Sequence, residues 1–100
     1  MKKVSKQNIL KARINTLNRK IKNLNFSNLY SEKIQKATDD AMKNLELWKN
    51  LELKYESFKK TETNKYKRKF YKQKAKLYNF KIQKSLSTLM VIFINLKNLN

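Results

Sequence analysis

The chain has 100 residues, of which 25 are Lys or Arg and only 7 are Asp or Glu, so its formal net charge is +18. It contains no Cys and no His, which excludes disulfides, thiolate metal sites and the side chain most often used for acid–base catalysis and metal binding. It contains no Gly either, which excludes the glycine-rich loops that cradle phosphates. We therefore expect a protein that is not an enzyme and that holds no cofactor or metal ion.

The acidic residues are confined to one part of the chain. All seven lie between residues 32 and 62, where seven lysines balance them, whereas residues 1–31 and 63–100 contain basic residues and no acid. A chain rich in Lys and Asn without Gly or Pro is typical of an A/T-rich genome, but that bias does not remove acids from both ends alone. The pattern indicates a neutral central segment between two cationic ones.

The first predicted helix covers about residues 5–24. Ser5 is a suitable N-cap, and the apolar residues after it are spaced alternately by four and three, as one face of a helix requires. These residues are Leu10, Ile14, Leu17, Ile21 and Leu24. Residues 23–31 are rich in Asn and Ser and interrupt the spacing, so we expect the first bend there.

The second predicted helix covers about residues 32–60. Ser31 reads as its N-cap, and Glu32 would place a carboxylate in the first turn, where the helix dipole favours it. Its apolar seam contains Ile34, Ala37, Ala41, Trp48, Leu51, Tyr55 and Phe58. Asn44 is the one polar interruption of that seam, and we expect Trp48 to anchor the core.

The third predicted helix covers about residues 65–97 and follows a second bend at residues 61–64. Its seam contains Tyr71, Ala75, Tyr78, Ile82, Leu89, Ile92 and Leu96. This seam is displaced by one residue from the heptad count of the second helix, which favours a hairpin over one unbroken coiled coil. Residues 91–94 could alternatively form a short buried strand. The predicted fold class is all-α: one domain, a small bundle of about three helices, extended or coiled-coil-like.

Residues 65–84 hold the strongest candidate binding residues: nine are basic, five are aromatic and none is acidic. Four lysines form one row about 17 Å long on a helix, and three more form a second row on the other side of the seam. Cations in such rows bind phosphates and release condensed counterions. The first row is Lys65, Lys69, Lys72 and Lys76, and the second is Lys67, Lys74 and Lys81. The other predicted nucleic-acid-binding residues are Arg68, Lys6, Lys11, Arg13, Arg19, Lys20 and Lys22.

The aromatic residues of this stretch have two explanations. Helical spacing accounts for Tyr71 and Tyr78 as seam residues, and for the aromatics as a group this structural explanation is favoured. Tyr66 and Phe70 fall outside the seam and are candidates for stacking on unpaired bases. The lysines are different, because an ordinary solvated face mixes charges of both signs and this one does not.

Other kinds of site find little support in the sequence. Glu52 and Glu56 lie one turn apart, but no second carboxylate helix or histidine completes a metal site. The basic start of the chain is not followed by the apolar core of a signal peptide, and the apolar residues 86–96 are about half of the ~20 needed to span a bilayer. We expect an intracellular protein, in the cytoplasm or an organelle matrix, without a transmembrane segment.

A short stretch carries one resemblance. Asn64-Lys65 and Arg68-Lys69, after Lys59-Lys60, resemble the basic C-terminal stretch of the three-helix small-subunit ribosomal proteins. The histidine that usually precedes the asparagine is absent here. The match spans residues 59–69 and does not place the chain in that family.

These features favour a structural RNA-binding protein of a ribosome or another ribonucleoprotein, with RNA preferred to DNA and with other proteins of the assembly as further partners. Only Arg13, Arg19 and Arg68 offer the bidentate fork that reads guanine edges, so specificity would come from shape. One alternative is a coiled-coil interaction or inhibitor module, of phage or plasmid type, that docks on an acidic protein or on DNA, with Asn44 setting the register. A less favoured alternative is contact with a membrane surface, in which residues 65–84 meet anionic lipid and residues 86–96 dip into the interface.

Overall fold

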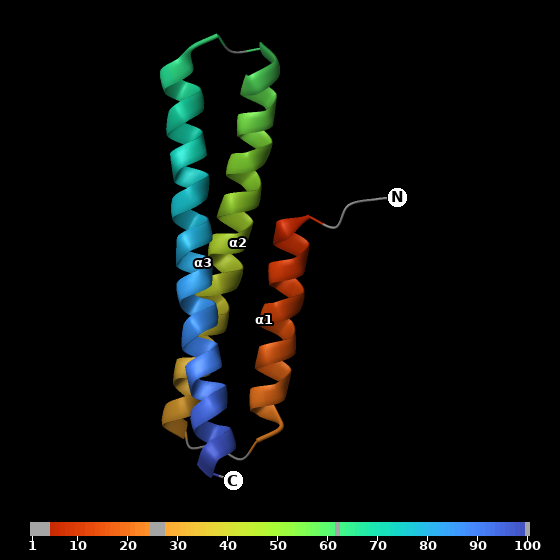
Figure 1. Cartoon of the computed structure of the whole chain (residues 1–100), viewed down its shortest axis with the longest axis vertical. Coiled ribbons are helices and arrows are strands. Elements are labelled where there is room, and N and C mark those ends of the chain that lie inside the picture. The colour runs from red at the N-terminus through yellow and green to blue at the C-terminus, as the bar shows by residue number, and fades with distance from the viewer. Residues whose placement is uncertain (1–4, 25–27, 62, 100) are drawn as a thin grey trace.

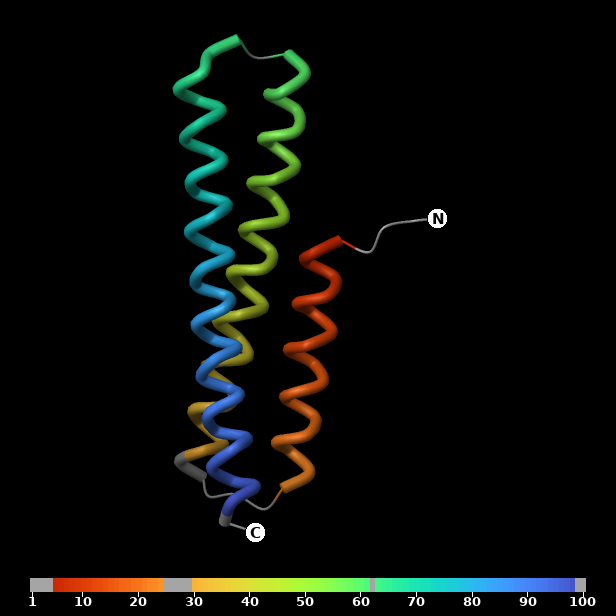
Figure 2. The backbone as a smooth tube through the Cα atoms, viewed as in Figure 1, coloured from red at the N-terminus to blue at the C-terminus, as the bar shows by residue number. Residues whose placement is uncertain are grey.

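The computed structural model describes residues 5–24, 28–61 and 63–99, and its elements are three helices (Figure 1). They are α1 (Lys6–Lys22), α2 (Asn28–Thr61) and α3 (Lys65–Leu99). α2 and α3 form a long antiparallel hairpin, and α1 lies along the half of it that is remote from the α2–α3 turn (Figure 2). The predicted all-α bundle of about three helices is confirmed.

The helices differ in length, and this leaves half of the hairpin without a third helix. α1 has 17 residues, whereas α2 and α3 have 34 and 35. At about 1.5 Å per residue, α1 spans only half of the hairpin. The radius of gyration is 16.7 Å, which exceeds the ~13 Å of a compact 100-residue domain. We call the half that extends from the start of α1 to the α2–α3 turn, residues 51–74, the distal hairpin.

The hydrophobic core lies where all three helices meet. The buried side chains are Leu10, Ile14, Leu17 and Ile21 of α1, Ile34, Ala37, Ala41, Leu45 and Trp48 of α2, and Ala75, Ile82, Leu86, Leu89, Ile92 and Leu96 of α3. In the distal hairpin the seam residues that the structure describes, such as Leu51 and Tyr71, are only half-buried. Two helices alone cannot enclose their shared seam from both sides.

The starts of the helices test the predicted caps. The side chain of Ser5 accepts a hydrogen bond from the backbone N–H of Asn8 at 3.2 Å, so the predicted N-cap of α1 is confirmed. The predicted N-cap at Ser31 is wrong, because α2 begins at Asn28 and Ser31 lies exposed within it. The earlier start carries Tyr30 against the core, and burial of that ring outweighs a capping preference worth about 1 kcal/mol.

The seam of α2 also differs from the expectation at one position. Leu45 occupies the buried position between Ala41 and Trp48, while Asn44 is half-buried at its edge. A seam that runs from Ala41 through Leu45 to Trp48 is apolar throughout, whereas a seam through Asn44 would bury an amide. Asn44 therefore does not interrupt the core.

The second bend is confirmed at the predicted place. α2 ends at Thr61 and α3 begins at Lys65, after the side chain of Asn64 has accepted hydrogen bonds from the N–H groups of Tyr66 and Lys67 at 2.9 and 3.3 Å. Below this turn the rings of Phe58 and Tyr71 stack, with their centroids 5.2 Å apart.

The end of α3 settles the choice between helix and strand. Residues 91–94 are helical, and the strand alternative is wrong. A helix places Ile92 in line with Leu89 and Leu96, and all three side chains are buried in the core. A strand would have turned consecutive side chains to opposite faces and lost that line.

Candidate nucleic-acid interface

The two predicted lysine rows lie on opposite flanks of α3. All four lysines of the first row are exposed, as are Lys67 and Lys81 of the second. Lys74 is half-buried, with its ammonium nitrogen 5.6 Å from the centre of the Phe70 ring. Because the seam between the rows packs against α2, the rows cannot meet one phosphate strand across it. Each row faces a different side of the molecule.

Lys81, the last residue of the second row, lines a groove between α2 and α3. The groove has a volume of about 730 Å³ and is open to solvent. Five lysines line it: Lys33, Lys36 and Lys43 from α2, and Lys81 and Lys84 from α3. We call it the cationic groove. Asp40 is its one acidic lining residue, and Ser85, Thr88 and Asn44 add hydroxyl and amide groups that hydrogen-bond oxygen atoms.

Sequence reasoning missed the α2 lysines of this groove, because residues 32–62 are neutral on average. The zero net charge of this segment conceals how its lysines are distributed around the helix. Lys36 and Lys43 are seven residues apart, with Lys33 one turn earlier, so the three share one side of α2. That spacing was a usable signal, but only the packing of α3 shows that this side meets Lys81 and Lys84.

The electrostatics of the groove favour a polyanion. Five ammonium groups face one carboxylate between two low-dielectric helices, an arrangement that focuses positive potential. The ring of Tyr78 lies beneath the Lys81 ammonium, 5.2 Å from its centre, and holds that side chain over the groove. An open groove suits a phosphate chain better than a small molecule, whose site is usually enclosed.

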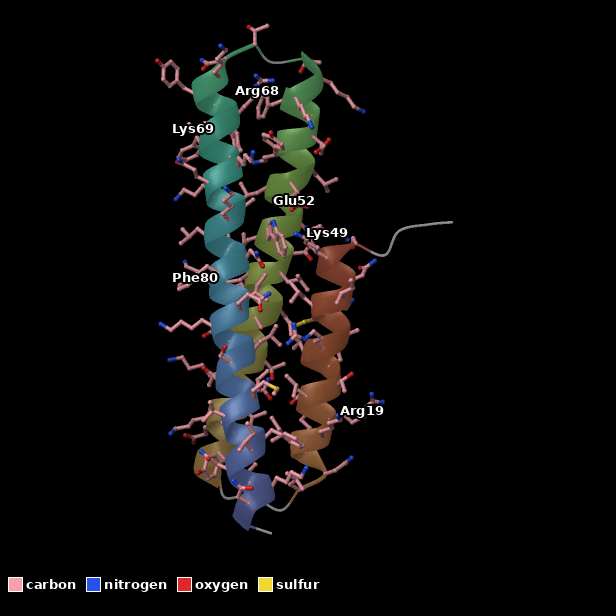
Figure 3. The ribbon with its side chains drawn as sticks, in the orientation of Figure 1. Arg19, Lys49, Glu52, Arg68, Lys69 and Phe80 are labelled. Carbon is pink, nitrogen blue, oxygen red and sulfur yellow. The ribbon has the colours of Figure 1, made fainter. Side chains whose placement is uncertain are left out.

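The predicted cations of α1 are all exposed. Figure 3 shows Arg19 pointing away from the hairpin. Lys20 instead lies over the Phe93 ring of α3, with its ammonium nitrogen 6.0 Å from the ring centre. Arg19, Lys20 and Lys22 occupy the last turn of α1, where cations also stabilise the helix dipole. Part of the charge of α1 thus has a structural explanation.

The remaining predicted residues lie near the start of α3. Arg68 is half-buried, and Figure 3 shows it between α2 and α3. Tyr66 is 86% exposed and Phe70 is 53% exposed, so both offer ring surface to a ligand. Phe80, which the sequence analysis did not single out as a ligand, is 66% exposed and points away from the bundle in Figure 3.

Two carboxylates of α2 lie beside the start of α1. The side-chain amide of Gln7 donates to Glu52 at 2.5 Å. Glu52 and Glu56 line a small pocket with Ser5. α1 has no acid in its own first turn, so α2 supplies the negative charge that its dipole favours. Among the described residues no group of three or more acids could hold a metal ion.

In the described part of the chain, no helix combines the length and the apolar character that crossing a bilayer requires. Comparison of the chain with known protein families, with curated proteins and with solved structures finds no match.

Proposed function

We propose that the protein binds RNA through its phosphate backbone, as a structural component of a ribosome or another ribonucleoprotein. The cationic groove is the observation that carries this proposal. It brings lysines from two helices to one open channel, although one of those helices is neutral overall. Neutralising several phosphates there would release counterions, the main source of sequence-independent affinity.

The exposed aromatic rings support RNA over duplex DNA as the ligand. Tyr66, Phe70 and Phe80 offer ring faces on the same helix that carries both lysine rows. Unpaired bases of RNA loops and ends stack on such rings, whereas the bases of a duplex are already stacked on one another. Lysine acts as a point charge without a fixed geometry, so recognition would depend on RNA shape.

The shape of the molecule fits a structural role. It measures 56 × 32 × 16 Å, and exposed cations lie on α1, on both flanks of α3 and in the cationic groove. A thin protein that is cationic on several sides can contact separate RNA segments at once and neutralise the repulsion between them. The membrane-surface alternative keeps only part of its apolar stretch, because Leu86, Leu89 and Ile92 are buried in the core while Val91 and Ile94 stay exposed.

The test compares two quadruple variants that remove equal charge. The groove variant is Lys33→Gln, Lys36→Gln, Lys81→Gln and Lys84→Gln, and the control variant is Lys49→Gln, Lys54→Gln, Lys59→Gln and Lys60→Gln, whose lysines lie outside the groove. Binding of a structured RNA with single-stranded loops is measured over a range of salt concentrations. For the unchanged protein with about six phosphates contacted, log K should fall against log salt with a slope near −4 to −5.

The groove variant should bind more weakly, and its salt slope should shrink by about three to four units, because four phosphate contacts are lost. The control variant should lose much less affinity. Equal losses in the two variants would show that net charge alone drives binding. A flat salt response of the unchanged protein would refute RNA binding through phosphates altogether.

A further inference from the structure

The outer face of α3 carries a second apolar seam. Most of the large apolar side chains that the described residues expose lie on this helix rather than on α1 or α2. Those on the side away from the core are 42% to 86% exposed. They are Tyr66, Phe70, Leu77, Phe80, Val91 and Ile94. We call this set the outer seam.

The outer seam has the spacing of a coiled coil. Its six residues lie on a line of positions that alternates steps of four and three over the length of the helix: 66, 70, 73, 77, 80, 84, 87, 91 and 94. Gln73, Lys84 and Ser87 occupy the three polar positions of that line. A repeat of 3.5 residues makes a narrow stripe that faces one neighbouring helix. A helix that lies on a bilayer instead needs a broad apolar face.

The residues that flank the outer seam indicate which charge its partner should carry. In a coiled coil, the positions beside the seam form ion pairs between the helices and select the partner. Here Lys67, Lys74 and Lys81 flank the seam on one side, and Lys69 and Lys76 flank it on the other. Pairing two copies of α3 through this face would bring lysines against lysines. The flanks therefore favour a partner with carboxylates at these positions.

We propose that the outer seam docks an acidic amphipathic helix of another protein. The seam would contact the apolar residues of that helix, and the five flanking lysines would pair with its Glu or Asp residues. Lys84, within the seam, would pair with a carboxylate and set the register. This docking goes beyond RNA binding and does not depend on it, because its apolar contacts come from side chains that do not line the cationic groove. Only Lys81 and Lys84 belong to both surfaces.

RNA would use only the aromatic part of this face. The aromatic rings Tyr66, Phe70 and Phe80 could stack on bases, but the seam continues through Leu77, Val91 and Ile94, which have no flat surface for stacking. A partner helix uses both the aromatic and the aliphatic positions. RNA and bilayers are nevertheless separate arms of the test.

The probe is a synthetic helical peptide of about four heptads, with Leu and Ile at the seam positions and Glu at the flanking positions. A scrambled peptide of the same composition carries the same charge without the seam. Calorimetry with the full chain should show saturable binding of the heptad peptide at one site, and binding of the scrambled peptide at least about tenfold weaker. Equal binding of the two peptides would show that charge alone attracts them and would overturn the proposal.

The seam variant is Leu77→Ser with Val91→Ser, and its control is Ile9→Ser with Leu53→Ser, which are exposed on α1 and α2. All four side chains are exposed, so helicity by circular dichroism should not change. The seam variant should bind the heptad peptide about 30-fold more weakly or worse, because two apolar contacts are lost. The control variant should bind it unchanged. Equal affinity in the two variants would overturn the proposal.

Further measurements distinguish a helical partner from RNA and from a bilayer. The seam variant should keep its RNA affinity and its binding to vesicles of phosphatidylcholine with phosphatidylserine. If it loses either as strongly as it loses the peptide, the face belongs to that ligand and the helix proposal fails. A charge reversal, Lys67→Glu with Lys74→Glu and Lys81→Glu, should transfer preference to a heptad peptide with Lys at the flanks. If that variant still prefers the Glu peptide, the flanking lysines do not select the partner and the proposal fails.

Discussion

Trp48 and Leu53 lie five residues apart on α2, and their side chains have opposite surroundings. Trp48 is 5% exposed in the three-helix core, whereas Leu53 is 63% exposed beyond it. Both are large apolar residues within one helix, so their types alone do not separate them. The difference arises because Trp48 falls on the apolar seam and Leu53 does not.

Replacing Trp48 should therefore weaken the fold strongly. We expect Trp48→Ala to lower the free energy of unfolding by about 3–5 kcal/mol, because it removes a large ring and leaves a cavity among three helices. Urea unfolding followed by circular dichroism measures the change. Leu53→Ala is the control and should change stability by less than about 0.5 kcal/mol. Similar effects of the two substitutions would mean that the helices do not share one core.

The Glu52 carboxylate should stabilise the docking of α1 on α2. Its carboxylate accepts the Gln7 amide and lies near the start of α1. Glu52→Gln keeps the size of the side chain but removes the charge that the α1 dipole favours, so stability should fall by about 1 kcal/mol. Glu46→Gln, an exposed control on the same helix, should have little effect. If both changes act equally, the carboxylate does not help to dock α1.

At the scale of the elements, the hairpin has a well-packed half and a thinly packed half. The half beside α1 contains every described side chain that is buried. The distal hairpin is held by half-buried contacts, such as the stack of Phe58 on Tyr71, and by the Asn64 cap. Local stability follows the density of buried contacts, so the two halves should open independently.

Hydrogen exchange tests this difference. Amides of residues 51–61 and 65–74 should exchange faster than those of residues 34–48 and 82–96, because opening the distal hairpin exposes little apolar surface. Phe58→Ala should speed exchange in the distal hairpin further and leave the core amides nearly unchanged. Uniform protection along both helices would contradict this division.

The first lysine row lies exposed along α3. Changing Lys65, Lys69, Lys72 and Lys76 to Gln keeps helix propensity and the seam, so far-UV circular dichroism should be unchanged or stronger as self-repulsion falls. RNA affinity should drop if this row contacts phosphates. The matched control changes Lys49, Lys54, Lys59 and Lys60 of α2 to Gln. Lys36 and Lys43 of the same helix are left unchanged in the control because they line the cationic groove. Equal losses would show that the position of the row does not matter.

For the whole molecule, the decisive quantity is the net charge of +18 on a chain of 100 residues. Repulsion of this size destabilises the compact state, and anions relieve it by screening or by binding. We expect Tm to rise as sodium chloride is increased from about 0.05 M to about 0.5 M, over which the Debye length falls below ~5 Å. A constant Tm would indicate that the charges are far enough apart to be harmless.

RNA should stabilise the fold more than salt does at equal ionic strength, because a ligand that binds only the folded state adds its binding free energy. The groove variant should have a higher Tm in low salt than the unchanged protein and a smaller gain from RNA. Such opposite shifts would separate the stabilising effect of charge removal from the loss of a binding site.

The helices, the second bend and most of the core could be predicted from the amino-acid sequence alone. Seam spacing is a local property of one helix, so Leu10, Ile14, Ile82 and Leu89 were placed correctly without any knowledge of their partners. The error at Ser31 arose because a capping preference is worth only about 1 kcal/mol, which packing outweighs. The error at Asn44 arose because the packed seam runs through Leu45 and keeps the amide at its edge. The absence of Cys and His excluded disulfides, thiolate metal sites and histidine ligands, and this too needed no knowledge of the packing.

Which charges share a surface depends on how the helices pack, and this could not be predicted from the sequence. The sequence showed cationic segments and a neutral one, but a neutral helix can present lysines on one side and acids on another. The antiparallel packing of α3 on α2 brought Lys36 and Lys43 to the same groove as Lys81 and Lys84. Among the described residues, it also left the outer seam of α3 without a neighbouring helix. Both outcomes depend on the rotation of each helix about its axis, which is set by the burial of all three seams together.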